Sequence, residues 1–230
     1  MSVAVVADAH LGGPGGSAGL ITEQLAELPS LGCDRLVLLG DLFHIWVGSP
    51  KFETDDVRAI RSALLELREQ GVRIDYVEGN RDFFIGSGPY RELFDSVSYE
   101  TTFKADGKTF LAVHGDGLDD RDRQYRFWRW LSKSSLSRFL MLNLPGFLAR
   151  RFVRVTESQL AKTNFKHKTK IPEEAIRSYA EKRLSEGFDV LLLGHFHEPR
   201  DWSEGQGEIR LLDAWFNSQQ IEWFGRDSSS

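Results

Sequence analysis

Five short apolar runs in this chain are each followed at once by polar residues that can bind metal ions. The runs have the length and composition of buried β-strands, and they are Val3–Ala7, Leu36–Leu39, Ile74–Val77, Phe110–Val113 and Val190–Leu193. The polar residues that follow them are Asp8, His10, Asp41, Asn80, Arg81, Asp82, His114, Asp116, His195 and His197. Because ligands in α/β sheets bind beyond the carboxyl ends of the strands, we expect these side chains to meet around one point.

Two helical patterns alternate with the strands. One begins at Thr54, which is placed as an N-cap, and ends at Gly71. The other begins after Pro172 and ends at Gly187. Farther along, residues 209–224 predict a β-hairpin. Alternating strands and helices indicate a layered α/β domain.

Two pairs of candidate metal ligands have a spacing of two residues. Asp8 and His10 form the first pair, and His195 and His197 form the second. On an extended segment, residues i and i+2 point to the same side, so each pair can chelate one ion. One such pair is common by chance, but four of the six histidines follow predicted strands beside another candidate ligand. The combination favours a metal site over turn chemistry or plain surface polarity.

Three single residues complete the candidate ligand set. Asp41 has two carboxylate oxygens and can bridge two ions, while Asn80 offers an amide oxygen and His114 an imidazole nitrogen. Such mixed ligands suit Mn, Fe or Zn better than Ca or Mg. Two ions about 3.5–4 Å apart can clamp a phosphate and direct hydroxide in line at phosphorus. The set therefore predicts a two-metal phosphoester hydrolase.

One arginine stands directly beside these ligands. The guanidinium of Arg81 is a fixed cation that can bind phosphate oxygens in bidentate fashion and stabilise charge that develops in the transition state. The alternative is that Arg81 forms an ion pair with its neighbour Asp82.

Taken together, the ordered motifs resemble those of the calcineurin-like metallophosphoesterases. They are Asp8-x-His10, Gly40-Asp41, Gly79-Asn80-Arg81-Asp82, His114-Gly115-Asp116 and Gly194-His195-Phe196-His197. The resemblance spans residues 3 to about 224 and implies a four-layer α/β/β/α sandwich. It also implies two metal sites, one formed by Asp8, His10, Asp41 and His197, and the other by Asp41, Asn80, His114 and His195.

Within that superfamily the chain is similar to the UDP-2,3-diacylglucosamine hydrolases. The features are residues 40–48, residues 79–83 with arginine at position 81, residues 114–118 followed by Asp122 and Tyr125, and a helical insert before His195. The resemblance implies two divalent ions, namely Mn²⁺, and cleavage of a pyrophosphate at the uridine-side phosphorus to give UMP and a lipid monosaccharide phosphate. Arg81, His114 and His195 are the predicted catalytic residues.

The resemblance also implies residues that bind the substrate. These are Asn80, Arg81, Asp122, Ser158, Asn164, Lys166 and Lys168. Asn164 matches the family without gaps, whereas Ser158 and the two lysines match only if the alignment shifts. His44 stands where relatives often carry an acidic residue, and it either supports the metal ligands or faces solvent.

The insert at residues 121–170 differs from the rest of the chain in charge. It holds 13 basic and 2 acidic residues, a net charge of +11, which leaves −16 elsewhere because the whole chain carries −5. It is also rich in large apolar residues, among them Phe127, Trp130, Phe139 and Phe147. Basic apolar helices match a segment in a membrane interface or a lid over acyl chains. The alternatives are a helical pair with solvated arginines and a nucleic-acid surface.

We therefore expect one domain over residues 1–224, with the insert at about 121–170 and a tail at 225–230. The single cysteine, Cys33, excludes an internal disulfide and is expected to be a small buried residue. No apolar run reaches the roughly 20 residues of a membrane span, and no secretory signal is recognisable. These features predict a cytoplasmic enzyme that is peripheral on the inner membrane, acts on a UDP-linked acylated sugar and binds no nucleic acid.

Two other functions fit the same sequence features. The first is a metallophosphodiesterase that acts on another nucleotide or nucleic-acid ester. The second is a scaffold without catalysis that uses the insert to bind a protein. The second is disfavoured because all seven ligand positions are filled.

Overall fold

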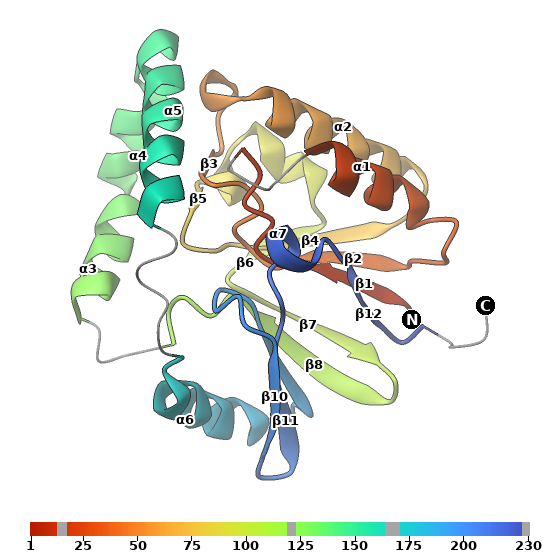
Figure 1. The fold of residues 1–230 in the computed structure, drawn as a ribbon. Helices are drawn as coiled ribbons and strands as arrows, with labels where there is room; N and C mark the ends of the chain where they lie inside the picture. The colour runs from red at the N-terminus through yellow and green to blue at the C-terminus, as the bar shows by residue number, and fades with distance from the viewer. Residues whose placement is uncertain (13–17, 119–122, 164–170, 227–230) are drawn as a thin grey trace.

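Two five-stranded sheets face each other in the computed structural model (Figure 1). The structure describes residues 1–12, 18–118, 123–163 and 171–226, except for the side chains of Trp128 and of residues 157–163. The first sheet has the order β12-β1-β2-β4-β6, and its neighbours are parallel except for β12 and β1. Its strands are β12 (Glu222–Phe224), β1 (Val3–Val6), β2 (Arg35–Leu38), β4 (Arg73–Val77) and β6 (Ser96–Ser98).

The second sheet has the order β10-β11-β9-β8-β7. β9 is parallel to both β8 and β11, whereas β7–β8 and β10–β11 are antiparallel. Its strands are β10 (Arg200–Glu204), β11 (Gly207–Leu211), β9 (Val190–Leu193), β8 (Lys108–Val113) and β7 (Glu100–Ala105). The carboxyl ends of β1, β2 and β4 therefore lie at one edge of the first sheet, and those of β8 and β9 lie at one edge of the second.

Helices cover the outer face of each sheet. α1 (Ala18–Glu27) and α2 (Asp55–Glu69) lie over the first sheet, and α6 (Glu173–Leu184) lies over the second (Figure 1). Along β1, Ala4 and Val6 pack toward the helices, while Val3 and Val5 pack between the sheets. This alternation follows from the period of two in a strand and buries both faces. The predicted four-layer α/β/β/α order is confirmed.

The ends of α2 follow the predicted signals. The hydroxyl of Thr54 accepts a hydrogen bond from the backbone N–H of Val57, which is an N-cap. Gly71 adopts a φ of +86°, which a residue without a Cβ adopts readily, and the chain turns there into β4. Cys33 is buried, as expected.

The predicted hairpin at residues 209–224 is wrong. β11 belongs to the second sheet and β12 to the first, and the short helix α7 (Trp215–Ser218) connects them. Trp215 is buried, and its backbone N–H donates to the carbonyl of Ala7 at the end of β1. A strand pattern does not reveal its partner, so two successive strand patterns look alike whether they pair with each other or join different sheets.

Three helices form the insert between β8 and α6. They are α3 (Arg123–Ser132), α4 (Ser135–Leu142) and α5 (Gly146–Thr163), and they stand beside β3 (Trp46–Val47) and β5 (Asp82–Phe83) (Figure 1). α5 is anchored by apolar packing, because Ala149 and Val153 are buried against Val47 and Phe52. Short 3₁₀ helices complete this side, namely η1 (Pro50–Phe52), η2 (Ile85–Ser87) and η3 (Pro89–Leu93). Among the described residues, no helix has both the length and the apolar content to cross a membrane.

Candidate metal centre

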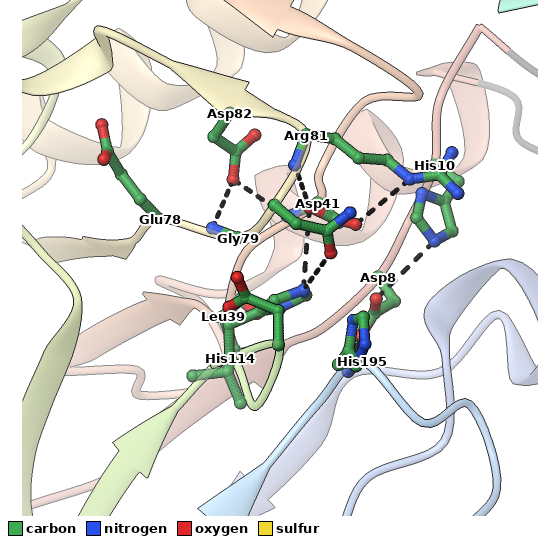
Figure 2. A network of polar contacts seen from close by, with 12 residues as sticks. Asp8, His10, Leu39, Asp41, Glu78, Gly79, Arg81, Asp82, His114 and His195 are labelled. Atoms are coloured by element: carbon green, nitrogen blue, oxygen red, sulfur yellow. Dashed lines mark hydrogen bonds and ion pairs between the residues drawn. The ribbon is translucent and has the colours of Figure 1, made fainter. Parts of the chain in front are cut away.

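The loops that follow five parallel strands meet at one place between the sheets. Three of these loops leave β1, β2 and β4 of the first sheet, and two leave β8 and β9 of the second. Figure 2 shows side chains from these loops pointing into a common centre. The expected convergence is present, and both sheets contribute to it.

The first group of metal-competent atoms lies on Asp8, His10 and His197. Their donor atoms all lie within 4.8 Å of one another. Nε2 of His197 is 3.0 Å from Oδ1 of Asp8 and 3.1 Å from Nε2 of His10. Burial lowers the pKa of His10 well below its ordinary value, so the ring is neutral and one ring nitrogen keeps a lone pair. Two imidazoles and a carboxylate that converge in this way fit a divalent transition metal.

The second group lies on Asp8, Asp41 and His114, and all three side chains are buried. Nδ1 of His114 is 2.9 Å from the carbonyl oxygen of Leu39, which can only accept, so Nδ1 carries a hydrogen and Nε2 faces the carboxylates. Burial lowers the pKa of His114, but Asp41 and Asp8 outweigh burial and raise it. The neighbouring carboxylates therefore favour protonation of this ring, and bound ions would compete with that proton.

Two further candidate ligands border the second group. Oδ1 of Asn80 is 3.3 Å from Nε2 of His114. The ring of His195 packs edge-on against that of His114, with ring centres 5.1 Å apart. The backbone N–H of His195 donates to Oδ2 of Asp8. The carboxylate common to both groups is that of Asp8, whereas the resemblance implies Asp41 as the bridge. The assignment of the bridge stays a prediction.

The extended backbone predicted for the pairs Asp8/His10 and His195/His197 is wrong, although their members do meet. Asp8 and His10 have φ angles of 51° and 45°, and His195 and His197 have 65° and 57°. These are left-handed conformations, not an extended segment, and Asp41 shares them with a φ of 50°. Strained backbone of this kind in non-glycine residues is concentrated at functional sites.

Three glycines are required because ligand side chains pass very close to their Cα atoms. A Cβ at Gly40 would lie 2.6 Å from Nδ1 of His114, and one at Gly194 would lie 2.7 Å from Oδ2 of Asp8. A Cβ at Gly79 would overlap Oδ1 of Asp41. The glycine that precedes Asp41, Asn80 and His195 in the motifs is thus part of the site.

The side chain of Arg81 runs across Asp41 toward His10 (Figure 2). Its Nε is 3.3 Å from Oδ2 of Asp41, and its NH1 is 2.8 Å from Nδ1 of His44. His44 is 2% exposed and its ring stacks on that of His10 at 5.3 Å. Of the two alternatives for His44, the structure favours support of the site. It also favours Asp41 over Asp82 as the carboxylate that holds the guanidinium of Arg81.

His44 gives a prediction for stability against pH. Burial, assisted by Arg81, lowers the pKa of His44 to about 4. Between about pH 6.5 and 4 the unfolded chain binds this proton and the folded chain does not, so stability is fully present above pH 6.5 and falls as the pH falls. We expect the free energy of urea unfolding of metal-free protein to decline more steeply over this window in the wild type than in His44→Gln. Equal slopes would contradict a buried neutral His44.

Asp82 has a supporting place at the site that the sequence analysis did not assign to it, although it lies in the Gly79 motif. Its side chain is fully buried, and Oδ2 accepts the backbone N–H of Gly79 at 2.8 Å and that of Asp41 at 3.1 Å. Burial, followed by the neighbouring charge of Asp41, raises the pKa of Asp82 to about 7. The carboxylate joins two ligand loops, as Figure 2 shows. Its place at the end of the Gly79 motif was the available signal, but the motif does not reveal which backbone it holds.

The predicted substrate-binding residues fall into two sets. Asn80 and Arg81 lie at the metal centre. Asp122, Asn164, Lys166 and Lys168 lie outside the described residues, and Ser158 belongs to α5 with its side chain outside them. Their role in substrate binding stays a prediction.

The chain is similar to known proteins in sequence and in structure. The family model of the calcineurin-like phosphoesterases matches residues 1–199. A UDP-2,3-diacylglucosamine hydrolase from Ralstonia nicotianae is 28% identical, with 91% of this chain and 82% of that protein covered. One from Stutzerimonas stutzeri is 32% identical, with 72% and 69% covered. The solved structure of phosphopantetheinyl hydrolase from Mycobacterium tuberculosis aligns over 100% of this chain and 97% of that one, with a TM-score of 0.46 and 14% identity.

Proposed function

The chain belongs to the calcineurin-like phosphoesterase family, and from this we propose that it is a two-metal hydrolase that cleaves the pyrophosphate bond of UDP-2,3-diacylglucosamine. The products are UMP and 2,3-diacylglucosamine 1-phosphate. The observation that carries the hydrolase activity is the pair of Asp/His groups that meet at the carboxyl ends of strands from both sheets.

The seven candidate ligands would hold the two ions. They are Asp8, His10, Asp41, Asn80, His114, His195 and His197. When bound, two divalent ions polarise a phosphate and supply a nucleophile near neutral pH. Manganese is the proposed metal, because the imidazole, carboxylate and amide donors suit it and the resemblance implies it.

The protein's own groups would orient and neutralise the pyrophosphate. The guanidinium of Arg81, held between Asp41 and His44, is placed to bind phosphate oxygens whose charge grows in the transition state. Asp82 fixes the backbone on either side of this arginine, so the cation is pre-positioned. His114 and His195 pack against each other beside Asp8. We assign both as catalytic residues for the attack at the uridine-side phosphorus.

The surface of the insert supports a lipid substrate. Nine of the thirteen exposed large apolar residues in the described chain belong to α3, α4 and α5, and they are Phe127, Trp130, Leu136, Phe139, Leu140, Phe147, Leu148, Phe152 and Val155. Exposed apolar patches of this kind mark sites of interaction with a membrane, a ligand or a protein. The same helices carry basic residues, which suit an anionic membrane surface. We therefore place the enzyme on the cytoplasmic face of the inner membrane.

Turnover of two substrates by metal-loaded protein tests the proposal. Protein stripped with chelator and reloaded with Mn²⁺ is expected to release UMP from UDP-2,3-diacylglucosamine, and to do so far better than it cleaves bis(p-nitrophenyl) phosphate. In ¹⁸O-labelled water the label should appear in UMP, because attack is at the uridine-side phosphorus.

The other outcomes point to the alternative functions. Cleavage of the simple diester without UMP release would indicate a phosphodiesterase with a different substrate. Binding of Mn²⁺ without hydrolysis of either compound would indicate a scaffold.

A further inference from the structure

We infer that Arg129 on helix α3 and Lys133 just after it are positioning residues for the metal centre, so that ion affinity depends on their contacts with the ligand loops. The inference rests on the proposed two-metal function. It concerns how the loop at Asn80 and the segment after His114 are held in place.

Lys133 holds the loop that carries Asn80. Its ammonium donates to the carbonyl oxygen of Gly79 at 2.9 Å and lies 3.6 Å from the carboxylate of Glu78. The N–H of Gly79 is in turn held by Asp82 at 2.8 Å. The residue directly before Asn80 is thus held on both its backbone groups, by Lys133 on one side and by Asp82 on the other.

Arg129 and Tyr125 hold the segment that follows His114. Nε of Arg129 lies 2.8 Å from Oδ2 of Asp116, and the hydroxyl of Tyr125 donates to the same oxygen at 2.5 Å. The side chain of Asp116 is only 4% exposed. Asp116 is two residues after His114, so α3 contacts the segment that directly follows a candidate ligand.

The three residues that contact the ligand loops are four positions apart in the sequence. Tyr125, Arg129 and Lys133 therefore share one side of α3, since residues i and i+4 are neighbours on a helix. The rings of Phe127 and Trp130 lie 6.0 Å apart and are 54% and 67% exposed. The same helical segment thus makes polar contacts with the loops of the metal centre and exposes apolar rings.

Polar contacts attach the described side chains of α3 to the body. Of its described side chains none is buried, and a cavity of about 700 Å³ lies beside it, lined by Tyr99, Arg126, Arg129, Trp130 and Lys133 among others. Tyr99 contributes its ring face to the cations of Arg129 and Lys133 at 4.8 and 5.2 Å. Because none of the described side chains of α3 is buried in an apolar core, loss of one cation should loosen the hold of the helix on the ligand loops.

The burial of Lys133 makes its contacts sensitive to substitution. The side chain is 9% exposed and that of Glu78 is 11% exposed. Removing the ammonium would leave a nearly buried carboxylate without this partner, so the segment from Glu78 to Asn80 would rearrange. Groups that orient metal ligands typically change metal affinity by about 10- to 100-fold when they are removed.

The test compares two lysine-to-methionine variants of the insert contacts. Lys133→Met removes the contact with a ligand loop. Lys51→Met is the matched control, because Nζ of Lys51 donates to the carbonyl of Leu142 in α4 at 2.8 Å and so joins body and insert away from the ligand loops. Titration calorimetry of Mn²⁺ into chelator-stripped protein should show a loss of about tenfold or more in affinity for one ion in Lys133→Met. Lys51→Met should keep the wild-type affinities.

A second variant and a second measurement make the test decisive. Arg129→Met should also lower the affinity for one Mn²⁺ ion. Urea unfolding of each variant in chelator measures the stability of the metal-free fold. Wild-type affinity in both Lys133→Met and Arg129→Met, or equal losses in Lys133→Met and Lys51→Met, would overturn the inference. A Lys133→Met chain that does not fold, beside an Arg129→Met chain that folds and binds both ions normally, would also overturn it. If the wild type takes up no Mn²⁺, the proposed function fails as well, which separates the two failures.

Discussion

Replacing Asp8 with asparagine is expected to abolish the binding of both ions and to lower turnover by about a thousandfold. Asp8 is the residue common to both metal groups. Burial raises its pKa, but His114 and the hydrogen bond from His197 outweigh burial and hold the pKa well below the ordinary value, so the carboxylate is charged. Losing about 4 kcal/mol of the charge stabilisation that metals supply corresponds to about three powers of ten in rate.

The substitution leaves the backbone intact, which makes the result interpretable. Asparagine tolerates the left-handed φ of 51° found at Asp8, and its amide oxygen can still accept the N–H of His195. Asp106→Asn is the matched control. Asp106 lies in the β7–β8 turn, has a φ of 52° and accepts a hydrogen bond from the N–H of Gly225. Metal content measured by mass spectrometry and UMP release should fall in Asp8→Asn alone. Two bound ions in that variant would show that Asp8 is not a shared ligand.

Replacing Gly79 with alanine is expected to lower kcat/KM by about a hundredfold and to destabilise the fold by about 1–3 kcal/mol. The added Cβ would overlap Oδ1 of Asp41 and would lie 2.9 Å from Nε2 of His114. Neither group can withdraw easily, because Asp41 is held by the N–H of Arg81 and His114 by the carbonyl of Leu39. One methyl group therefore shifts two candidate ligands at once.

Gly146→Ala serves as the control for Gly79→Ala. A Cβ at Gly146, the first residue of α5, would meet only the end of the flexible Arg150 side chain at 3.5 Å. Turnover and urea unfolding of the two variants separate the steric effect from any general effect of losing a glycine. Full activity in Gly79→Ala would contradict the close approach between that Cα atom and Asp41.

Much of the site could be predicted because strand ends carry local signals. An apolar run followed by Gly-Asp or Gly-Asn fixes both the strand and the polar residue that leaves it, and neither depends on distant contacts. The capped start of α2 at Thr54 was predictable for the same reason. The histidines were informative because four of the six follow such runs.

Pairing and local backbone geometry could not be predicted in this way. The strand patterns at residues 209–224 predict one hairpin, but β11 and β12 join different sheets. Asp8 and His10 were expected on an extended segment, but each adopts a left-handed conformation. Both outcomes depend on partners far away in the sequence, such as the backbone of Gly40 and Asp41 that accepts hydrogen bonds from the N–H groups of Asp8 and His10.

The amino-acid sequence by itself determined which side chains this protein offers to metal ions, and it indicated the α/β layers that present them, because apolar periodicity and turn residues act over a few positions. Only the tertiary structure decided that two sheets share the site, that Lys133 holds the carbonyl of Gly79, that Asp82 accepts the N–H of Asp41, and that His44 is buried against His10 and Arg81. Those features arise where segments about 30 to 190 residues apart meet, and no local pattern encodes such a meeting.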